Sequence, residues 1–284
     1  MTDGNLPGAQ PVFTERAGLA WTEAQDKTDA QLDPIGRVAI AALPLSLGQR
    51  VIDVGCGCGQ TLLQLGDIVG RAGHVLGVDI SAPMLARARQ RAEGRPQIAT
   101  AIADAETYSF DAGAFDAVYS RFGVMFFQDP RAAFANLRRA MRKGGCLSFA
   151  CWQALARNPW AEQPLRAVAA VLPPAPLQPM LQPDNPGPFY LADPERVRTI
   201  LSGTGFTNIV VDGWENPVHL GGAMTVAQAV AYCRLIGPAS RAMADAPEAL
   251  SPALDAALTA ALEPFSSARG IWMDAAAFIV TARA

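Results

Sequence analysis

The run Val51–Gly59 constrains the fold most strongly, because an apolar stretch leads directly into three glycines at alternate positions. Val51–Val54 has strand character, and Thr61–Leu65 begins a helical pattern. Alternate glycines make a turn without Cβ atoms, so a ligand can lie directly against the backbone. Amide groups at the start of the following helix point into that space with partial positive charge. The spacing is G-x-G-x-G, not the G-x-G-x-x-G of dinucleotide enzymes, which favours a nucleoside with a carboxylate tail.

An acidic residue follows a second apolar run, at the distance from the glycine turn that is typical of a nucleotide-binding β-α-β unit. His74–Val78 reads as another buried strand and ends in Asp79, twenty positions after Gly59. A carboxylate at the carboxyl end of the second strand can accept hydrogen bonds from both ribose hydroxyls. The glycine turn and Asp79 together predict a nucleoside-cofactor site. Two unrelated buried strands with turn glycines are the alternative.

Strand and helix patterns alternate from residue 50 to about 152, which implies parallel pairing with right-handed crossovers. We therefore predict an α/β fold with a doubly wound, mostly parallel seven-stranded sheet, an inserted lid and extra C-terminal helices. The expected strands are 51–54, 74–79, 98–102, 115–120, 146–151, 207–212 and one near 271–281. The expected helices lie near 60–69, 82–93, 130–142 and 193–203, with two more before the last strand.

Composition changes along the chain divide this single expected domain into four parts. Phe13 and Trp21 are spaced for one face of a short N-terminal helix. Nine prolines fall between Pro159 and Pro188, so this region cannot continue the sheet and is predicted to cover the ligand cleft. A disordered linker is the alternative for it. The parts are an N-terminal helical cap (1–48), the cofactor-binding core (49–152), the lid insertion (153–192) and the C-terminal part of the sheet with inserted helices (193–284).

Charge and apolar content narrow the classes of function. The net charge is −3 and the arginines are dispersed, which argues against nucleic acid as a partner. No apolar stretch approaches the roughly 20 residues that a membrane span needs. Because Met1–Pro11 lacks a basic region followed by an apolar one, no secretory signal is expected. A cytoplasmic location is therefore predicted.

Cysteine usage favours neither a disulfide framework nor a metal centre. The five cysteines are odd in number and scattered through the expected core strands. Cys56-x-Cys58 has no second pair, and the histidines of the chain are His74 and His219. We therefore expect no metal.

Five segments, in order along the chain, resemble the class I S-adenosylmethionine-dependent methyltransferases, particularly the broad group that includes quinone-ring and small-metabolite methyltransferases. The resemblance covers about residues 45–155 well, and 193–284 in outline. At Lys143 the family usually has proline, so the turn loses stiffness there without an effect on chemistry. The segments are Val51–Gly59 (V-L-D-x-G-x-G-x-G), Gly77–Leu85 (G-x-D-x-S-x-x-M-L), Ala103–Glu106 (D-A-E), Phe115–Ser120 (F-D-x-V-x-S) and Leu137–Gly145 (L-x-x-x-L-x-P-G-G).

The resemblance implies S-adenosylmethionine as the cofactor and gives a role to each matching residue. The amino-acid end of the cofactor would lie over Gly55 and Gly57, with Asp53 near its ammonium group. Asp79 would hold the ribose.

The same resemblance assigns further residues to the adenine and methionine portions of the cofactor. Ile80 and Met84 would sandwich the adenine, since an aromatic ring gains from flat apolar and polarisable contacts. Asp104 would accept a hydrogen bond from the adenine amino group, with the Ala105 amide alongside. Ser120 would face the methionine portion through its backbone.

Aromatic residues after the fourth strand and around the lid are the expected contacts of the methyl acceptor. Their character suggests a small, partly apolar or aromatic metabolite, although each taken singly also fits core packing. They are Phe122, Met125, Phe126, Phe127, Trp152, Trp160, Phe189, Tyr190 and Trp214.

The implied reaction requires little from catalytic side chains, because a sulfonium already activates the methyl group and alignment can supply about 7–11 kcal/mol. A general base adds roughly 10²–10⁴-fold where the acceptor carries a proton. His219 and Tyr190 are the candidates for such chemistry, and Arg121 is the candidate for binding an anionic acceptor group. A packed histidine and a salt-bridged arginine are the structural alternatives.

The predicted function is methylation of oxygen, nitrogen or carbon on a small metabolite. A non-catalytic S-adenosylmethionine-binding regulatory protein is one alternative. A nicotinamide-dependent oxidoreductase is disfavoured by the glycine spacing, and because neither Lys27 nor Lys143 lies four residues after a tyrosine.

Overall fold

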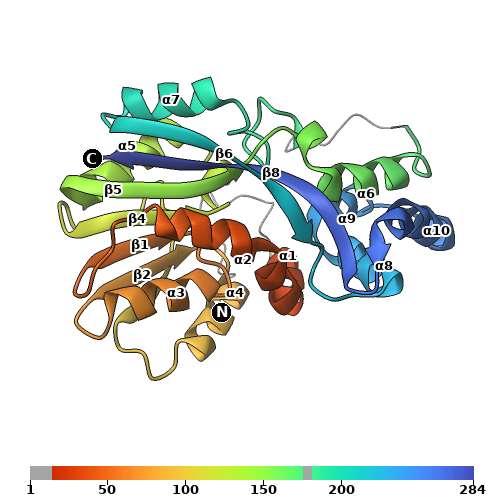
Figure 1. Ribbon diagram of the computed structural model, residues 1–284, viewed down its shortest axis with the longest axis horizontal. Coiled ribbons are helices and arrows are strands. Elements are labelled where there is room, and N and C mark those ends of the chain that lie inside the picture. The colour runs from red at the N-terminus through yellow and green to blue at the C-terminus, as the bar shows by residue number, and fades with distance from the viewer. Residues whose placement is uncertain (1–14, 175–180) are drawn as a thin grey trace, which may run out of the picture.

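The computed structural model describes residues 15–174 and 181–284, so the predicted place of Phe13 on a helix lies outside the described residues. Seven strands follow the order β3-β2-β1-β4-β5-β8-β6 (Figure 1), and the two-residue β7 (Ser266–Ser267) pairs with β8 off this path. The strands are β1 (Arg50–Val54), β2 (His74–Asp79), β3 (Ile98–Ile102), β4 (Phe115–Arg121), β5 (Met141–Trp152), β6 (Thr207–His219) and β8 (Gly270–Arg283).

The first five strands pair in parallel, and β8 runs antiparallel between β5 and β6. Ile52, Val118 and Leu147 in the middle of β1, β4 and β5 are fully buried. Strands covered on both faces need such continuous apolar character, which alternating strands lack. The predicted α/β class with a doubly wound, mostly parallel sheet is confirmed.

Helices cover both faces of this sheet. Figure 1 shows α2 and α3 in front of it and α5 behind it, and α5 packs against α7. Asp129 caps α5, and Asp193 caps α7, each accepting a hydrogen bond from a backbone amide two or three residues further on. The helices of this part are α1 (Glu15–Glu23), α2 (Gln25–Ala41), α3 (Gln60–Val69), α4 (Ala82–Arg91), α5 (Pro130–Ala140) and α7 (Pro194–Gly203).

A C-terminal lobe, defined as the four helices α6, α8, α9 and α10, lies at one end of the long strands β6 and β8 (Figure 1). Its own apolar core includes Leu254, Leu258 and Leu262, which fall on one face of α10. The four helices are α6 (Pro159–Ala169), α8 (Val226–Leu235), α9 (Gly237–Ala242) and α10 (Ser251–Leu262).

The ends of several elements differ from the sequence prediction, and three α-helices rather than the expected two lie between β6 and β8. The helix expected to reach residue 142 ends at Ala140, because Met141 already pairs with Phe115 as the first residue of β5. A register shift before Cys146 takes up the intervening residues, with Gly144 at a φ of 75°. Both β6 and β8 continue beyond their predicted ends, since they pair with each other as far as His219.

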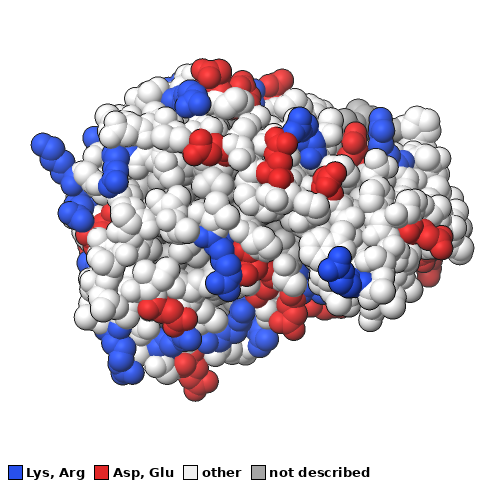
Figure 2. Space-filling model, viewed as in Figure 1, with Lys and Arg blue, Asp and Glu red and all other residues white. Residues whose placement is uncertain are grey.

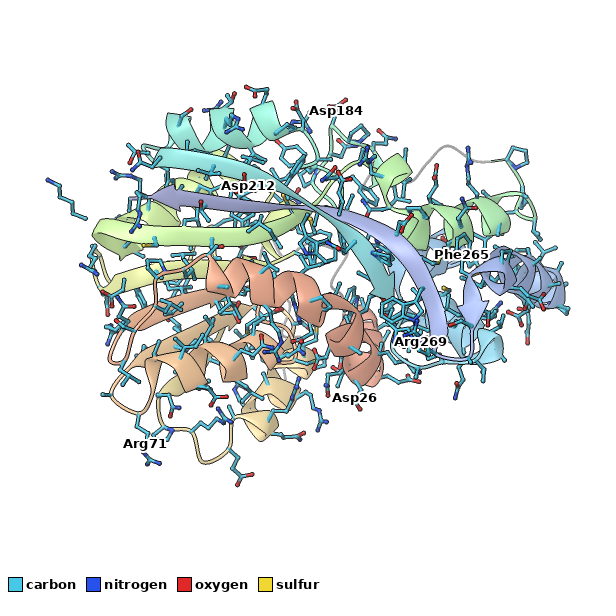
Figure 3. All side chains as sticks on the ribbon, viewed as in Figure 1. Asp26, Arg71, Asp184, Asp212, Phe265 and Arg269 are labelled. Atoms are coloured by element: carbon cyan, nitrogen blue, oxygen red, sulfur yellow. The ribbon has the colours of Figure 1, made fainter. Side chains whose placement is uncertain are left out.

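Charges of both signs are interspersed over the face of the molecule drawn in Figure 2. Asp26 of α2 and the turn residues Arg71, Asp184 and Arg269 lie at the periphery (Figure 3). Within residues 15–174 and 181–284, no helix combines the length and apolarity of a membrane span. The same residues contain no group of three or more histidine, cysteine or acidic side chains that could hold a metal ion.

Candidate functional site

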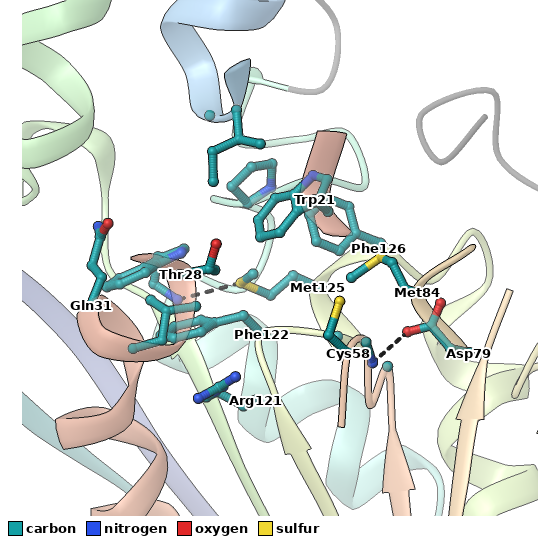
Figure 4. A pocket seen from close by; sticks show the side chains of 18 of the residues that line it. Trp21, Thr28, Gln31, Cys58, Asp79, Met84, Arg121, Phe122, Met125 and Phe126 are labelled. Atoms are coloured by element: carbon teal, nitrogen blue, oxygen red, sulfur yellow. Dashed lines mark hydrogen bonds between the residues drawn. The ribbon is translucent and has the colours of Figure 1, made fainter. Parts of the chain in front are cut away.

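A cavity lies at the carboxyl ends of β1, β2 and β4, where open α/β sheets bind their ligands. The loops after β1, β2, β3 and β4 line one side of it. Residues of α1, α2, the lid region and the C-terminal lobe line the other side. Figure 4 shows part of this lining, with Asp79 and Met84 at one end and Thr28 and Gln31 at the other.

Two positions of the turn after β1 require a residue without a Cβ. Gly55 and Gly57 lie in the left-handed region, with φ of 68° and 54°. A Cβ on Gly55 would lie 2.8 Å from Cα of Gly123, and one on Gly57 would lie 3.0 Å from Cε of Met84. The sequence pattern thus produces a backbone surface that faces the cavity directly.

Asp79 joins the end of β2 to this turn. Its carboxylate accepts hydrogen bonds from the backbone amides of Gly57 (2.8 Å; dashed in Figure 4) and Ser81 (2.9 Å). Burial raises the pKa of Asp79, whereas the hydrogen bonds from Ser81 and Gly57 oppose that rise. The carboxylate therefore both fixes the turn and lines the cavity.

Asp53 lies beneath the turn and does not line the cavity. It has no exposed surface, and its Oδ2 accepts a 2.5 Å hydrogen bond from the Thr61 hydroxyl. Its Oδ1 is buried and has no hydrogen-bond partner among the residues that the structure describes. Burial raises the pKa of Asp53 to about 7, against the lowering effects of the Thr61 hydrogen bond and the Arg121 charge.

Ser120 is also buried behind the cavity wall. Its hydroxyl donates to the carbonyl of Val54 (2.8 Å) and accepts from the amides of Gly123 (3.1 Å) and Val124 (3.3 Å). These bonds tie the end of β1 to the turn after β4. Gly123 approaches Gly55 beside this link.

Seven of the nine predicted cofactor residues come together around one end of the cavity. This end is acidic, because Asp104 and Glu106 follow β3 beside Asp79. Asp104 Oδ1 accepts a hydrogen bond from the Glu106 amide at 2.9 Å. The seven residues are Gly55, Gly57, Asp79, Ile80, Met84, Asp104 and Ala105.

Aromatic side chains from three separate segments form an apolar wall. The rings of Phe122 and Trp152 stack with centroids 4.0 Å apart and an interplanar angle of 12°. Trp160 of α6 lies beside Trp152, with ring centroids 4.8 Å apart and ring planes tilted by 48°. Phe122 itself has a φ of 61°, a strained conformation for a residue with a side chain. Of the predicted acceptor contacts, Phe122, Met125, Phe126, Phe127, Trp152, Trp160 and Phe189 line the cavity.

Three other predicted site residues lie outside the lining. The ring of Tyr190 packs under the Arg196 guanidinium, 4.7 Å from ring centroid to Cζ. Trp214 pairs with Ala277 within the sheet. His219 stacks on Trp272 with 4.5 Å between ring centroids. Each of these rings is used in packing, so the structure does not bring them to the cavity.

Arg121 lines the cavity, but its guanidinium already has partners. It lies 3.6 Å from a carboxylate oxygen of Asp29 and donates to the side-chain oxygen of Gln60. The same Asp29 also accepts from Arg91 at 2.9 Å and from Gln25 at 2.7 Å. Arg121 therefore holds α2 against β4 and α3.

The sequence analysis missed the contributions of α2 and the C-terminal lobe. Gln25, Thr28 and Gln31 are buried polar residues at intervals of three on α2, and all three line the cavity. Tyr232 of α8 donates its hydroxyl to Gln31 Oε1 at 3.0 Å, across 201 positions of the chain. The regular spacing of amide and hydroxyl side chains on α2 could have indicated a polar face toward a ligand. No sequence pattern around Tyr232 or Arg241 of the lobe indicated that these residues line the cavity.

Part of the chain is similar to known methyltransferases. Residues 51–145 match the family model described as a methyltransferase domain. Aklanonic acid methyltransferase DauC of a Streptomyces species is 33% identical over 138 residues, which are 45% of this chain and 63% of that protein. Nocamycin O-methyltransferase of Saccharothrix syringae is 32% identical over 164 residues, 56% of this chain and 57% of that protein. The chain thus spans less than two thirds of either relative.

A solved structure shows a similar fold over the whole chain. Phosphoethanolamine N-methyltransferase 2 of Haemonchus contortus, in complex with S-adenosyl-L-methionine, superimposes with a TM-score of 0.57 at 18% identity. The likeness covers 100% of this chain and 60% of that one. At this level of identity the likeness is one of fold.

Proposed function

Because residues 51–145 form a methyltransferase domain and the chain has the fold of class I S-adenosylmethionine-dependent methyltransferases, we propose that this protein transfers a methyl group from S-adenosylmethionine to a small, partly apolar metabolite. The observation that carries the proposal is Asp79, which lies at the end of β2, lines the cavity and is hydrogen-bonded to the bare glycine turn. A ribose can be held there while the rest of the cofactor lies along the backbone.

The residues present fit the chemistry of this cofactor. Asp53 lies beneath the turn with its buried Oδ1 unpartnered among the described residues, and an ammonium group above the turn would favour the ionised form of this carboxyl. Asp79 and Asp104 supply acceptors for hydroxyl and amino groups at the acidic end. Ile80 and Met84 offer flat apolar and polarisable contact to an adenine ring.

When bound, the cofactor supplies a methyl group that a positive sulfur already activates. The aromatic wall of Phe122, Trp152 and Trp160 would orient the acceptor and exclude water from it. Alignment of two bound reactants can contribute about 7–11 kcal/mol to the lowering of the barrier. Because burial raises the pKa of Tyr232, its hydroxyl stays protonated and acts as a hydrogen-bond donor rather than as a base.

A small-molecule acceptor is supported by the shape of the site and by the relatives. Trp160, Pro164, Pro188 and Phe189 line the cavity, and we propose that the described residues 153–174 and 181–192 form the predicted lid over the acceptor; residues 175–180 of that prediction lie outside the described residues. Two relatives are named for small-molecule methylation, of aklanonic acid and of nocamycin. The atom that receives the methyl group is proposed to be oxygen, nitrogen or carbon.

Two measurements test the proposal separately. Calorimetry with S-adenosylmethionine and with NADH measures which nucleoside the cavity binds; we expect binding of the former. Incubation with methyl-labelled S-adenosylmethionine and a panel of phenols, carboxylates, amines and quinone precursors measures transfer, and we expect label in at least one acceptor. Binding without any transfer would favour a regulatory protein, and a preference for NADH would contradict the proposal.

A further inference from the structure

The two arginines that line the cavity are already engaged within the protein. Arg121 lies 3.6 Å from a carboxylate oxygen of Asp29 and donates to the side-chain oxygen of Gln60. Arg241 of α9 also has an interaction inside the protein. No other basic side chain occurs among the described lining residues. A ligand therefore meets no free cation in the part of the cavity that the structure describes.

Away from the acidic residues that follow β2 and β3, the wall of the cavity is mostly apolar. Phe122, Trp152 and Trp160 line it, and Met125 and Phe189 add further apolar surface. A carboxylate that enters such surroundings loses its hydration, and without a paired cation nothing offsets that loss. This side of the cavity therefore favours an uncharged compound.

The carboxamide of Gln31 is a neutral donor fixed on this side of the cavity. Gln31 is 2% exposed and lies at the opposite end of the lining from Asp79 (Figure 4). Its Oε1 accepts a hydrogen bond from the Tyr232 hydroxyl at 3.0 Å, and that bond orients the carboxamide. No described residue accepts a hydrogen bond from Nε2, which carries two N–H donors. A buried donor without a partner favours a ligand that brings an acceptor oxygen to it.

The other two polar side chains that α2 contributes to the cavity already use their donors. Gln25 Nε2 donates to Asp26 at 2.9 Å and to Asp29 at 2.7 Å. The Thr28 hydroxyl donates to a backbone carbonyl one turn earlier, at 2.9 Å. Among the described lining residues of α2, the Gln31 side chain is thus the one that keeps donors for a ligand.

We propose that the methyl acceptor is an uncharged, planar aromatic compound with a carbonyl oxygen, as in an aryl ketone, and that Gln31 donates a hydrogen bond to this oxygen. The aromatic wall contacts the planar part of the compound. Gln31 is then a specificity-determining residue, and Tyr232 is a positioning residue that acts through it. The inference rests on the proposed function, because it describes the acceptor of that same site.

Three ligands with the same ring system test this assignment by calorimetry at pH 8, with S-adenosylhomocysteine present. They are 2-acetylnaphthalene, 2-isopropenylnaphthalene, in which a CH₂ group replaces the carbonyl oxygen, and 2-naphthoate, which is charged. We expect the native protein to bind the ketone about tenfold or more tightly than the naphthoate, because the anion finds no free cation. Equal or tighter binding of the naphthoate, or no binding of the ketone, would overturn the inference.

The ketone and the alkene isolate the hydrogen bond to Gln31. The double variant Gln31→Met/Tyr232→Phe replaces both partners by apolar groups of similar shape, a change that can leave stability nearly unaltered. The ratio of ketone affinity to alkene affinity should fall roughly fivefold from the native protein to this variant, since one neutral hydrogen bond is lost. Comparing ratios cancels the greater apolarity of the alkene. An unchanged ratio in the folded double variant would contradict the role of Gln31.

Gln90→Met/Tyr108→Phe is the matched control, because it makes the same two replacements outside the cavity lining. Gln90 is exposed on α4, and Tyr108 packs against Phe110 after β3. This control should keep the native ratio. An equal fall in the control and in Gln31→Met/Tyr232→Phe would likewise overturn the inference.

Titration with S-adenosylmethionine separates this inference from the proposed function. Its affinity should agree within about twofold among the native protein and both double variants, because Gln31 lies away from Asp79. Absence of S-adenosylmethionine binding to the native protein would count against the proposed function, whereas the ligand ratios report on the acceptor. If Gln31→Met/Tyr232→Phe does not fold, the preference of the native protein between the ketone and the naphthoate still decides.

Discussion

Asp53 is a single buried carboxyl whose ionisation links folding to pH. Its pKa rises from 3.8 to about 7 because burial disfavours the charged form. A folded-state pKa above the unfolded one gives stability that is complete below about 3.8 and is lost as the pH rises through about 7. We expect Asp53→Asn, without cofactor, to raise the melting temperature over the native protein by several degrees at pH 8 and by less at pH 5.

Thermal unfolding followed by circular dichroism at the two pH values measures this difference. Thr61→Val is a useful comparison, because it removes the hydrogen bond to Asp53 while leaving the carboxyl in place. An equal gain for Asp53→Asn at pH 5 and pH 8 would show that Asp53 does not titrate in this range.

Replacement of Asp79 should weaken binding of S-adenosylmethionine. Asp79→Ala removes the carboxylate that anchors Gly57 and that is proposed to hold the ribose. We expect calorimetry to show at least a tenfold loss of affinity for S-adenosylmethionine, about 1.4 kcal/mol or more. Asp212→Ala, an exposed acidic residue on β6, should leave affinity unchanged. Unchanged affinity in Asp79→Ala would remove this residue from the site.

A substitution at Gly57 tests whether the cofactor lies against the backbone of the glycine turn. Gly57→Val places a branched side chain at a φ of 54° and against Met84, in the space proposed for the ligand. We expect S-adenosylmethionine binding to be abolished. Gly113→Val controls for backbone strain alone, because Gly113 has a φ of 66° and no atom within 4 Å of an added Cβ. A folded Gly57→Val protein with native affinity would refute the proposed ligand position.

At the scale of residues, the site could be predicted where its parts are adjacent in sequence. The glycine turn and Asp79 were found because each follows an apolar strand with a recognisable spacing. Asp53 on β1 and Ser120 on β4 are buried behind the cavity wall, and the strand pattern alone did not show which side of the wall each residue would take.

At the scale of elements, α2 is the part whose attachment matters most for the cavity. Asp29 receives Arg91 of α4 and Arg121 of β4, and Asp33 accepts from Gln60 and Gln64 of α3. These polar contacts attach α2 to α3, α4 and β4. They keep Gln25, Thr28 and Gln31 over the ligand site.

Asp29→Ala should therefore loosen α2 selectively. Loss of a partly buried, charge-assisted set of hydrogen bonds is expected to lower stability by about 1–3 kcal/mol. Hydrogen–deuterium exchange should show faster exchange in 25–41 than in the native protein, with β5 unchanged. Asp26→Ala is the control, since Asp26 is exposed and accepts a hydrogen bond from the Gln25 side chain. Equal exchange in α2 of Asp29→Ala and the native protein would contradict this role.

Element positions were easier to predict than element ends. All seven strands of the main sheet were predicted; the five parallel ones read as apolar runs because strands buried on both faces are continuously apolar in sequence. The ends of β5, β6 and β8 depend on pairing with distant strands, as when β6 continues to His219 opposite Trp272. A helix within 153–192 was not predicted, since its prolines at 159 and 164 disfavoured one; Pro159 is in fact in the first turn of α6, where proline is tolerated.

At the scale of the whole molecule, the cavity unites three regions that are far apart in sequence. The sheet supplies an acidic, glycine-lined end, α1 and α2 supply buried polar groups, and the lobe supplies aromatic and basic ones. Contacts such as Tyr232 to Gln31 arise only when the chain has folded. For this reason the cofactor end could be predicted from sequence, and the acceptor end only in its aromatic character.

The central claim is that S-adenosylmethionine lies along the turn of Gly55 and Gly57 with its ribose on Asp79. A crystal structure of the protein with S-adenosylhomocysteine tests it most directly. The account predicts the ribose hydroxyls within hydrogen-bond distance of Asp79 and the sulfur facing the wall of Phe122 and Trp152. An empty turn at saturating S-adenosylhomocysteine, or the ligand bound elsewhere, would contradict it.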